Sequence, residues 1–166
     1  MGVFPRDVAI NVNVEDDGWQ ALCPNAAALV EAAARAALRD AAPAGNAPLV
    51  LDVLLTDDSE QRRLNRVYRG IDKPTNVLSF ALADTPAPAG APSLLGDVVL
   101  ARETVAREAA EQKKPLADHL QHLVVHGVLH LLGCDHENDT EAAIMEAREV
   151  AILQSLGVPD PYRDII

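Results

Sequence analysis

Residues 126–136 read His-Gly-Val-Leu-His-Leu-Leu-Gly-Cys-Asp-His, and the three histidines have the spacing of a metal site. His126 and His130 are four residues apart, so on a helix they share one face, about 6 Å apart along the axis. Gly133 can end that helix in the left-handed conformation, which lets His136 approach the same ion from another direction. Three nitrogen ligands with an open fourth position are typical of a catalytic zinc ion, one per chain.

The residues around this motif favour a buried helix. Between residues 123 and 132 every residue except the two histidines is apolar or glycine. Buried imidazoles need partners, so the alternative is a pair of core histidines hydrogen-bonded to the backbone. The pair His122 and His126 has the same spacing but lacks a returning third ligand. We expect His119 and His122 to line the approach to the site or to be ordinary polar positions.

The turn after Gly133 contains further donors. Cys134 could bind a soft metal, but a short turn favours one ligand, and we expect that ligand to be His136. Asp135 is expected to hold a ligand imidazole by a hydrogen bond. The spacing resembles that of metzincin peptidases, yet Gly127 stands where those enzymes carry their general-base glutamate. The missing glutamate argues against peptide hydrolysis.

The composition is that of an ordinary globular protein. The chain has 166 residues, of which 49% are hydrophobic and 23% charged, which predicts one domain with a substantial core. No apolar run is long enough to span a bilayer, and the first residues lack the apolar core of a signal peptide. The two cysteines, Cys23 and Cys134, give no disulfide framework. We therefore expect a reduced, cytoplasmic setting without a membrane partner.

The net charge of −11 disfavours a nucleic-acid partner, but the distribution of basic residues points the other way. Five of the 14 basic residues fall within one short span: Arg62, Arg63, Arg66, Arg69 and Lys73. Arg62, Arg66 and Arg69 are predicted on one face of a helix. The opposite face is predicted to pack through Leu64, Val67, Tyr68 and Ile71. The alternative is a solvated amphipathic helix with no binding role.

Hydrophobic periodicity and turn residues predict the element order β-α-β-α-β-β-α-α-α. The predicted strands are 8–14, 49–56, 75–81 and 94–100. The predicted helices run from Asn25 to about 41, from Asp57 or Asp58 to Gly70, from about 103 to 113, from Pro115 through the histidines, and from Asp139 to about 156. The adjacent third and fourth strands allow an antiparallel pair. We predict a single α+β domain over 1–166, with a four-stranded mixed sheet packed against about five helices. A turn is predicted at 16–18, a Pro/Ala-rich surface loop at 84–93 and a loose tail at 158–166.

Two stretches together resemble one family. Residues 64–80 read LNRVYRGIDKPTNVLSF, residues 126–136 carry the histidine motif, and Leu-Gly-Asp-Val lies between them at 95–98. The sequence is similar to the YbeY family of bacterial metal-dependent endoribonucleases, from the first predicted strand to the last helix. The resemblance implies a zincin-like helix carrying the metal site. Two departures stand out: Cys134 stands where the family commonly has Tyr, and the Pro/Ala loop is longer than usual.

The resemblance also implies an activity and its residues. His126, His130 and His136 would be the zinc ligands and part of the catalytic site. Arg69 matches the family's functionally important arginine, expected to meet RNA phosphate, with Arg66 and Lys73 as further substrate-binding residues. The family acts on single-stranded RNA in 3′-end maturation of 16S ribosomal RNA and in ribosome quality control. The ribosome and its assembly factors are the implied partners.

The sequence leaves the general base and the class of function open to alternatives. Asp135, Asp97 or His122 could serve as the base, and each could equally be structural. Two other functions compete with RNA cleavage. One is a zinc hydrolase of peptide or small-molecule substrates. The other is a non-enzymatic ribosome-assembly module in which zinc only fixes the histidine turn.

Overall fold

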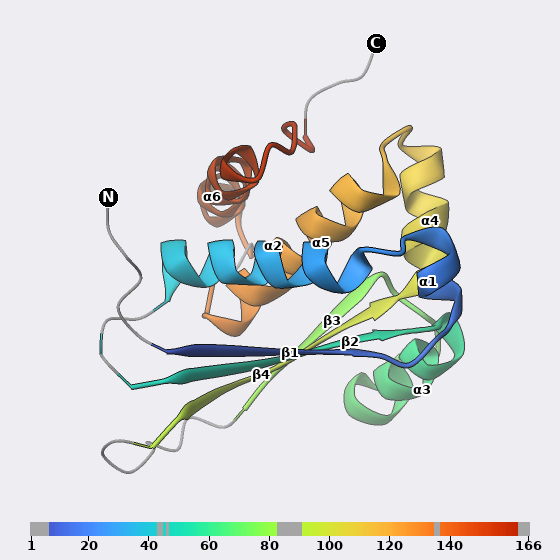
Figure 1. Cartoon of the computed structure of the whole chain (residues 1–166), viewed down its shortest axis with the longest axis horizontal. Coiled ribbons are helices and arrows are strands. Elements are labelled where there is room, and N and C mark those ends of the chain that lie inside the picture. Colours follow the sequence, from blue (N-terminus) through green and yellow to red (C-terminus); the bar gives the residue numbers. More distant parts are fainter. Residues whose placement is uncertain (1–6, 43–44, 46, 83–90, 135–136, 163–166) are drawn as a thin grey trace.

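The computed structural model describes residues 7–42, 45, 47–82, 91–134 and 137–162 (Figure 1). Four strands lie in these ranges: β1 (Val8–Val14), β2 (Leu49–Thr56), β3 (Val77–Ala81) and β4 (Ser93–Ala101). Six helices lie there too: α1 (Gly18–Leu22), α2 (Ala26–Ala41), α3 (Asp58–Arg69), α4 (Arg102–Glu111), α5 (Leu116–Leu131) and α6 (Asp139–Ser155).

The strands form one mixed sheet in the order β1-β2-β4-β3. β1, β2 and β4 run parallel, whereas β3 pairs antiparallel with β4. Residues of β2 alternate between buried and half-buried over most of the strand, because successive side chains point to opposite faces of the sheet. The predicted four-stranded mixed α+β architecture is therefore confirmed.

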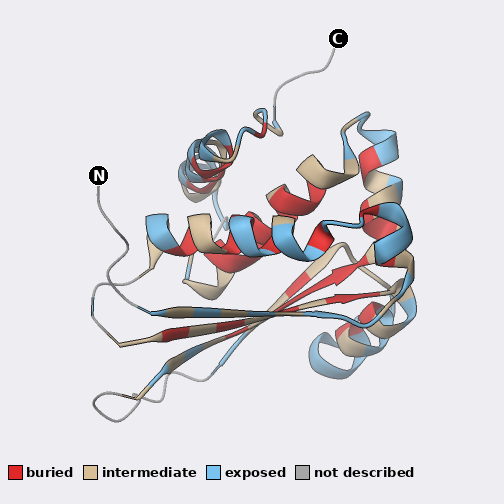
Figure 2. Cartoon of the chain, viewed as in Figure 1, coloured by how far each residue is buried: buried red, intermediate tan, exposed pale blue. Residues whose placement is uncertain are grey.

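Helices cover the two faces of the sheet unequally. Figure 1 shows α2 and α5 lying across one face, while α3 lies against the other. Figure 2 shows that the buried residues concentrate where α2 and α5 meet the strands. Helix α5 contacts α2, α4, α6, β3 and β4, so it is surrounded on nearly every side. The buried histidine helix predicted from its apolar sequence is confirmed.

Local capping interactions fix the ends of the two helices that matter most for the site. The side chain of Asp57 accepts a hydrogen bond from the Glu60 amide at the start of α3, and Gly70 ends that helix with φ of +72°. After α5, Gly133 has φ of +92° and the Cys134 amide donates to the Leu129 carbonyl at 2.9 Å. The glycine break predicted in the histidine motif is therefore present.

The structure corrects the predicted packing face of α3. Val67 and Tyr68 are 57% and 67% exposed, whereas the buried residues are Gln61 and Asn65. Gln61 donates from Nε2 to the Val99 carbonyl at 3.0 Å. A side-chain amide that donates to a backbone carbonyl therefore helps to fix α3 to the sheet. Hydrophobicity alone predicted the wrong packing face.

Smaller corrections concern the ends of elements. The segment predicted as a turn at 16–18 continues into the short helix α1, and Asn138 rather than Asp139 caps α6, accepting from the Glu141 amide at 2.9 Å. Most of the predicted loop at 84–93 lies outside the described residues. In the predicted tail, Val158 is only 5% exposed and the Tyr162 hydroxyl donates to Glu149, so residues 158–162 are anchored at these two points although Tyr162 is 43% exposed. None of the helices in the described ranges is long and apolar enough to cross a membrane.

Candidate metal centre

Two of the three predicted ligands converge on one point. His126 and His130 both lie on α5, and their Nε2 atoms are 3.1 Å apart. Two nitrogens that bind one tetrahedral zinc ion at about 2.0–2.1 Å are about 3.4 Å from each other. The observed separation is close to that value, so the pair fits a shared metal ion.

His136 and the predicted supporting carboxylate Asp135 both lie outside the described residues. Within the part of the chain that is described, no group of three or more His, Cys, Asp or Glu side chains is arranged to hold a metal ion. His136 remains the predicted third ligand.

A buried carboxylate from α6 supports the histidine pair. Glu149 is 1% exposed, and its Oε2 lies 2.9 Å from Nδ1 of His126. Its Oε1 accepts from Nε2 of His122 at 2.7 Å and from the hydroxyl of Tyr162 at 2.5 Å. An ionised carboxylate can only accept hydrogen bonds, so Nδ1 of His126 must carry a proton. The Nε2 atom of His126 then carries the lone pair that a metal ligand requires.

The carboxyl group of Glu149 is ionised at neutral pH. Burial by itself would raise the pKa of this carboxyl group. Hydrogen bonds from His122, His126 and Tyr162 outweigh that effect and lower the pKa of Glu149 to about 2. Burial and the hydrogen bond to Glu149 in turn raise the pKa of Tyr162, so its hydroxyl stays a donor.

Sequence reasoning missed Glu149, although a signal for it exists. Met145 and Ile152 are buried on α6, and Glu149 lies four residues after the first and three before the second. A carboxylate on the buried stripe of a helix needs a partner, because an unpaired buried charge is costly. Five histidines in the chain could have supplied that partner.

Arg69 reaches the same site from α3. Its Nη2 donates to the Ser79 carbonyl at 2.8 Å, and its guanidinium carbon lies 5.6 Å from the centre of the Phe80 ring. A pocket of about 740 Å³ is lined by Arg69 together with His122, His126 and His130. The structure therefore brings the predicted arginine and two predicted ligands to one cavity.

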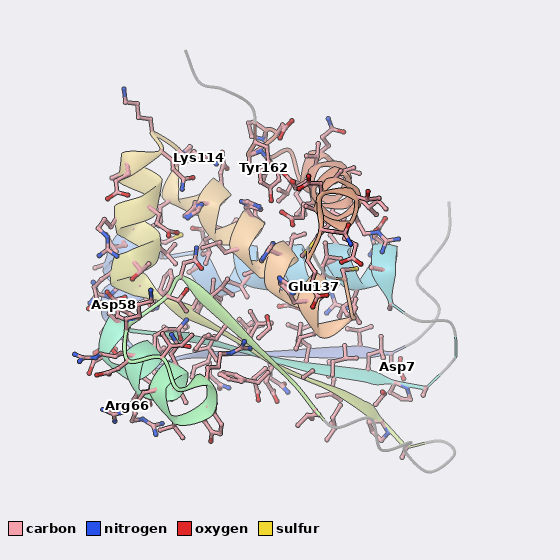
Figure 3. All side chains as sticks on the ribbon, turned by 180° about the vertical axis from the view of Figure 1, so that it is seen from behind. Asp7, Asp58, Arg66, Lys114, Glu137 and Tyr162 are labelled. Atoms are coloured by element: carbon pink, nitrogen blue, oxygen red, sulfur yellow. The ribbon has the colours of Figure 1, made fainter. Side chains whose placement is uncertain are left out.

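The other predicted substrate-binding residues do not line this pocket. Figure 3 shows Arg66 on α3, away from Lys114 and Tyr162 on the opposite side of the sheet. Arg62, on the predicted basic face, is paired with Asp72, with Nε 2.8 Å from Oδ1. Arg66 and Lys73 form no ion pair with any side chain in the described ranges. They remain candidates for more distant contacts with a substrate.

The remaining histidines line the pocket, whereas the candidate base Asp97 does not. His119 is 3% exposed and its Nε2 lies 2.9 Å from a carboxylate oxygen of Glu108. Both His119 and His122 line the pocket, but the second ring nitrogen of each is buried. Asp97 lies on β4 and is absent from the residues that line the pocket in the described structure. Asp135 lies outside the described residues, and the identity of the general base stays a prediction.

Gly127 explains why a peptidase glutamate has no place in this helix. A Cβ atom on Gly127 would lie 2.8 Å from Cγ1 of Val98 and 3.2 Å from Oγ of Ser79. The Ser79 hydroxyl also donates to the Gly127 carbonyl at 2.9 Å. This position therefore faces the sheet at close approach, and any side chain here would push α5 away from it.

Comparison with known proteins identifies the family. The family model for "Endoribonuclease YbeY" matches residues 12–157. The chain belongs to the YbeY family. A relative from Rhodospirillum rubrum, named endoribonuclease YbeY, is 53% identical over 170 residues, covering 96% of this chain and 85% of the relative. A second relative of the same name, from Azorhizobium caulinodans, is 55% identical over 156 residues, covering 92% and 95%.

The fold is also shared with a solved structure. The solution structure of TM1509 from Thermotoga maritima is similar over 93% of this chain and 97% of its own, with a TM-score of 0.56 and 25% sequence identity. The family model and the two relatives confirm the YbeY resemblance drawn from residues 64–80 and 126–136, and the solved structure confirms the fold class. The roles of individual YbeY-family residues in this chain stay predictions.

Proposed function

We propose that this protein is a zinc-dependent endoribonuclease that cleaves single-stranded RNA. Its expected natural task is 3′-end maturation of small-subunit ribosomal RNA and ribosome quality control, in the cytoplasm, alongside the ribosome and its assembly factors. One observation carries the proposal: the two Nε2 atoms of His126 and His130 meet in a pocket that the guanidinium of Arg69 also lines. Membership of the YbeY family supports it.

The histidines would hold the metal ion. His126 and His130 contribute Nε2 atoms, and His136 is the proposed third ligand. When bound, zinc supplies Lewis-acid activation of a phosphoryl oxygen or of water. Glu149 keeps the proton of His126 on Nδ1, so that Nε2 faces the pocket.

Arg69 would bind the phosphate at which the chain is cut. Its guanidinium has five N–H donors, and the bond to the Ser79 carbonyl fixes the plane of the group while leaving other donors for phosphate oxygens. Negative charge on those oxygens increases as the phosphorus becomes five-coordinate. A fixed planar cation stabilises that charge without having to reorganise.

Peptide hydrolysis is the weaker alternative for this site. Gly127 is packed against Val98 and Ser79, so the helix has no side chain at the position of the peptidase base. An acidic protein of net charge −11 also needs a localised cation to hold RNA, and Arg69 supplies one inside the pocket. Arg66 and Lys73 are proposed to contact the RNA backbone beyond the site.

The test combines metal content with cleavage assays. Wild-type protein and the His130→Ala variant are purified identically, with Glu111→Gln as a matched control, because Glu111 is exposed on α4. Zinc per chain is measured on each preparation. Each is then assayed on single-stranded RNA, duplex RNA and casein.

We expect about one zinc ion per chain and cleavage of single-stranded RNA alone for wild type and for Glu111→Gln. His130→Ala should lose both the zinc and the cleavage. Equal RNA cleavage by His130→Ala would show that the activity does not come from this site. Cleavage of casein in place of RNA would replace the proposal by the peptidase alternative.

A further inference from the structure

The C-terminal segment, residues 158–162, packs beside the metal centre. Val158 is 5% exposed and belongs to the hydrophobic core. Lys114, just before α5, donates from Nζ to the Pro161 carbonyl at 2.8 Å. Figure 3 shows Lys114 and Tyr162 on the same side of the molecule, near the start of α5. These contacts hold the Tyr162 side chain over Glu149.

Tyr162 completes the set of donors around Glu149. The hydroxyl of Tyr162 donates to Oε1 at 2.5 Å, and the same oxygen accepts from His122. The rings of Tyr162 and His122 also meet edge to face, with centroids 5.3 Å apart. The other oxygen, Oε2, accepts from His126. Both oxygens are therefore engaged, and rotation of the carboxylate would break at least two hydrogen bonds.

We propose that Glu149 and Tyr162 together position His126 for the metal, so that the C-terminal segment sets how tightly the ion is held. The inference rests on the metal centre of the proposed function. A ligand imidazole that donates its other N–H to a carboxylate is fixed in orientation and is more basic. Tyr162 fixes that carboxylate, and the contacts of Val158 and Pro161 fix Tyr162.

The two residues are expected to differ in their effect on zinc affinity. In Glu149→Gln, an NH₂ group replaces one of the two carboxylate oxygens. That NH₂ group then faces an N–H or O–H donor, either on His126 or on His122 and Tyr162, and the hydrogen bonds at that position are lost. Loss of such a supporting partner weakens metal binding about 10- to 100-fold. Tyr162→Phe removes one hydroxyl and keeps the ring, so zinc binding should weaken about 3- to 10-fold.

The experiment measures zinc affinity rather than cleavage. Metal-free wild type, Glu149→Gln and Tyr162→Phe are titrated with zinc against a chelator, and the visible spectrum of bound Co²⁺ reports the ligand geometry. Tyr68→Phe is the matched control, because Tyr68 is 67% exposed and lies on α3. Thermal unfolding of each metal-free protein shows whether the variant is folded.

The inference predicts weaker zinc binding for Glu149→Gln and Tyr162→Phe, an altered Co²⁺ spectrum for Glu149→Gln, and no change for Tyr68→Phe. Wild-type affinity in folded Tyr162→Phe would overturn it, even if Glu149→Gln does not fold. A wild type that binds no zinc would overturn both the inference and the metal centre. A wild type that binds zinc but does not cleave RNA would overturn only the proposed function.

Discussion

Replacing Gly127 by alanine tests how closely the metal-site helix must approach the sheet. The new Cβ would lie 2.8 Å from Cγ1 of Val98 and 3.2 Å from Oγ of Ser79 and Cγ2 of Val77. Carbon atoms in good contact are about 3.5–4.0 Å apart. Helix α5 or the strand side chains must therefore move by roughly 0.7–1.2 Å.

Three contributions set the size of the effect on the free energy of unfolding. Overpacking a well-packed core costs about 1–3 kcal/mol. Alanine gains about 1 kcal/mol of helix propensity over glycine. Displacement of α5 stretches the hydrogen bond from Ser79 to the Gly127 carbonyl, a loss of about 1 kcal/mol. The last two cancel, so the net destabilisation is about 1–3 kcal/mol, or a Tm lower by about 2–12 °C.

Urea unfolding followed by tryptophan fluorescence measures this difference. Trp19 is the single tryptophan of the chain, is fully buried, and donates from Nε1 to the Thr56 carbonyl at 2.9 Å. Val98→Ala and the double variant complete a mutant cycle. Because Val98→Ala removes the atom that Gly127→Ala would meet, the two changes should couple favourably by at least about 0.5 kcal/mol.

The opposite outcome is easy to recognise. If α5 has room at this position, Gly127→Ala behaves like an ordinary glycine-to-alanine change inside a helix and stabilises the protein. The cycle with Val98→Ala would then be additive. Either result would refute the close-approach explanation for the missing peptidase glutamate.

Two further predictions concern the pocket and the sheet. Arg69→Ala should lower kcat for RNA about 10²- to 10³-fold with zinc content unchanged. Arg69→Lys should not restore kcat, because lysine lacks the planar guanidinium group with its paired N–H donors. Unchanged cleavage by Arg69→Ala would remove this residue from the mechanism. Burial and the like charge of Asp52 raise the pKa of Asp97 above its ordinary 3.8, so the folded state binds this proton more tightly than the unfolded chain does. The protein therefore loses stability as the pH rises from 3.8 through the raised pKa of Asp97 in the folded state. In urea unfolding, Asp97→Asn should be more stable than wild type at neutral pH but not below pH 3.8. An equal difference in stability at both pH values would contradict this prediction.

Much of the fold was predictable because local patterns and tertiary packing agree. The apolar residues around His126 and His130 require burial on all sides, and α5 is surrounded by helices and strands. Gly133 has the positive φ that a helix end after the motif requires. Two predicted strands that follow each other without a helix between them allowed an antiparallel pair, and β3 and β4 form that pair in the mixed sheet.

The failures share one cause, which is polar pairing between distant segments. Val67 and Tyr68 suggested a packing face, but Gln61 and Asn65 are buried because their amides meet backbone groups of β4 and of the loop after α3. The sequence did not reveal the role of Glu149, because no residue close to it in the sequence is a partner for its carboxylate. The hydrogen bonds that justify its burial join residues 13 to 27 positions apart.

The sequence by itself determined the family, the order of the strands and longer helices along the chain, and the spacing that puts His126 and His130 on one face. These follow from periodicity, from glycine and proline, and from motifs that lie within a few residues. Only the tertiary structure decided that Glu149 and Tyr162 support His126, that Arg69 enters their pocket from α3, and that Gly127 faces Val98. Such contacts depend on which elements the sheet brings together, because a hydrogen bond or a steric limit has meaning only when both partners are in place.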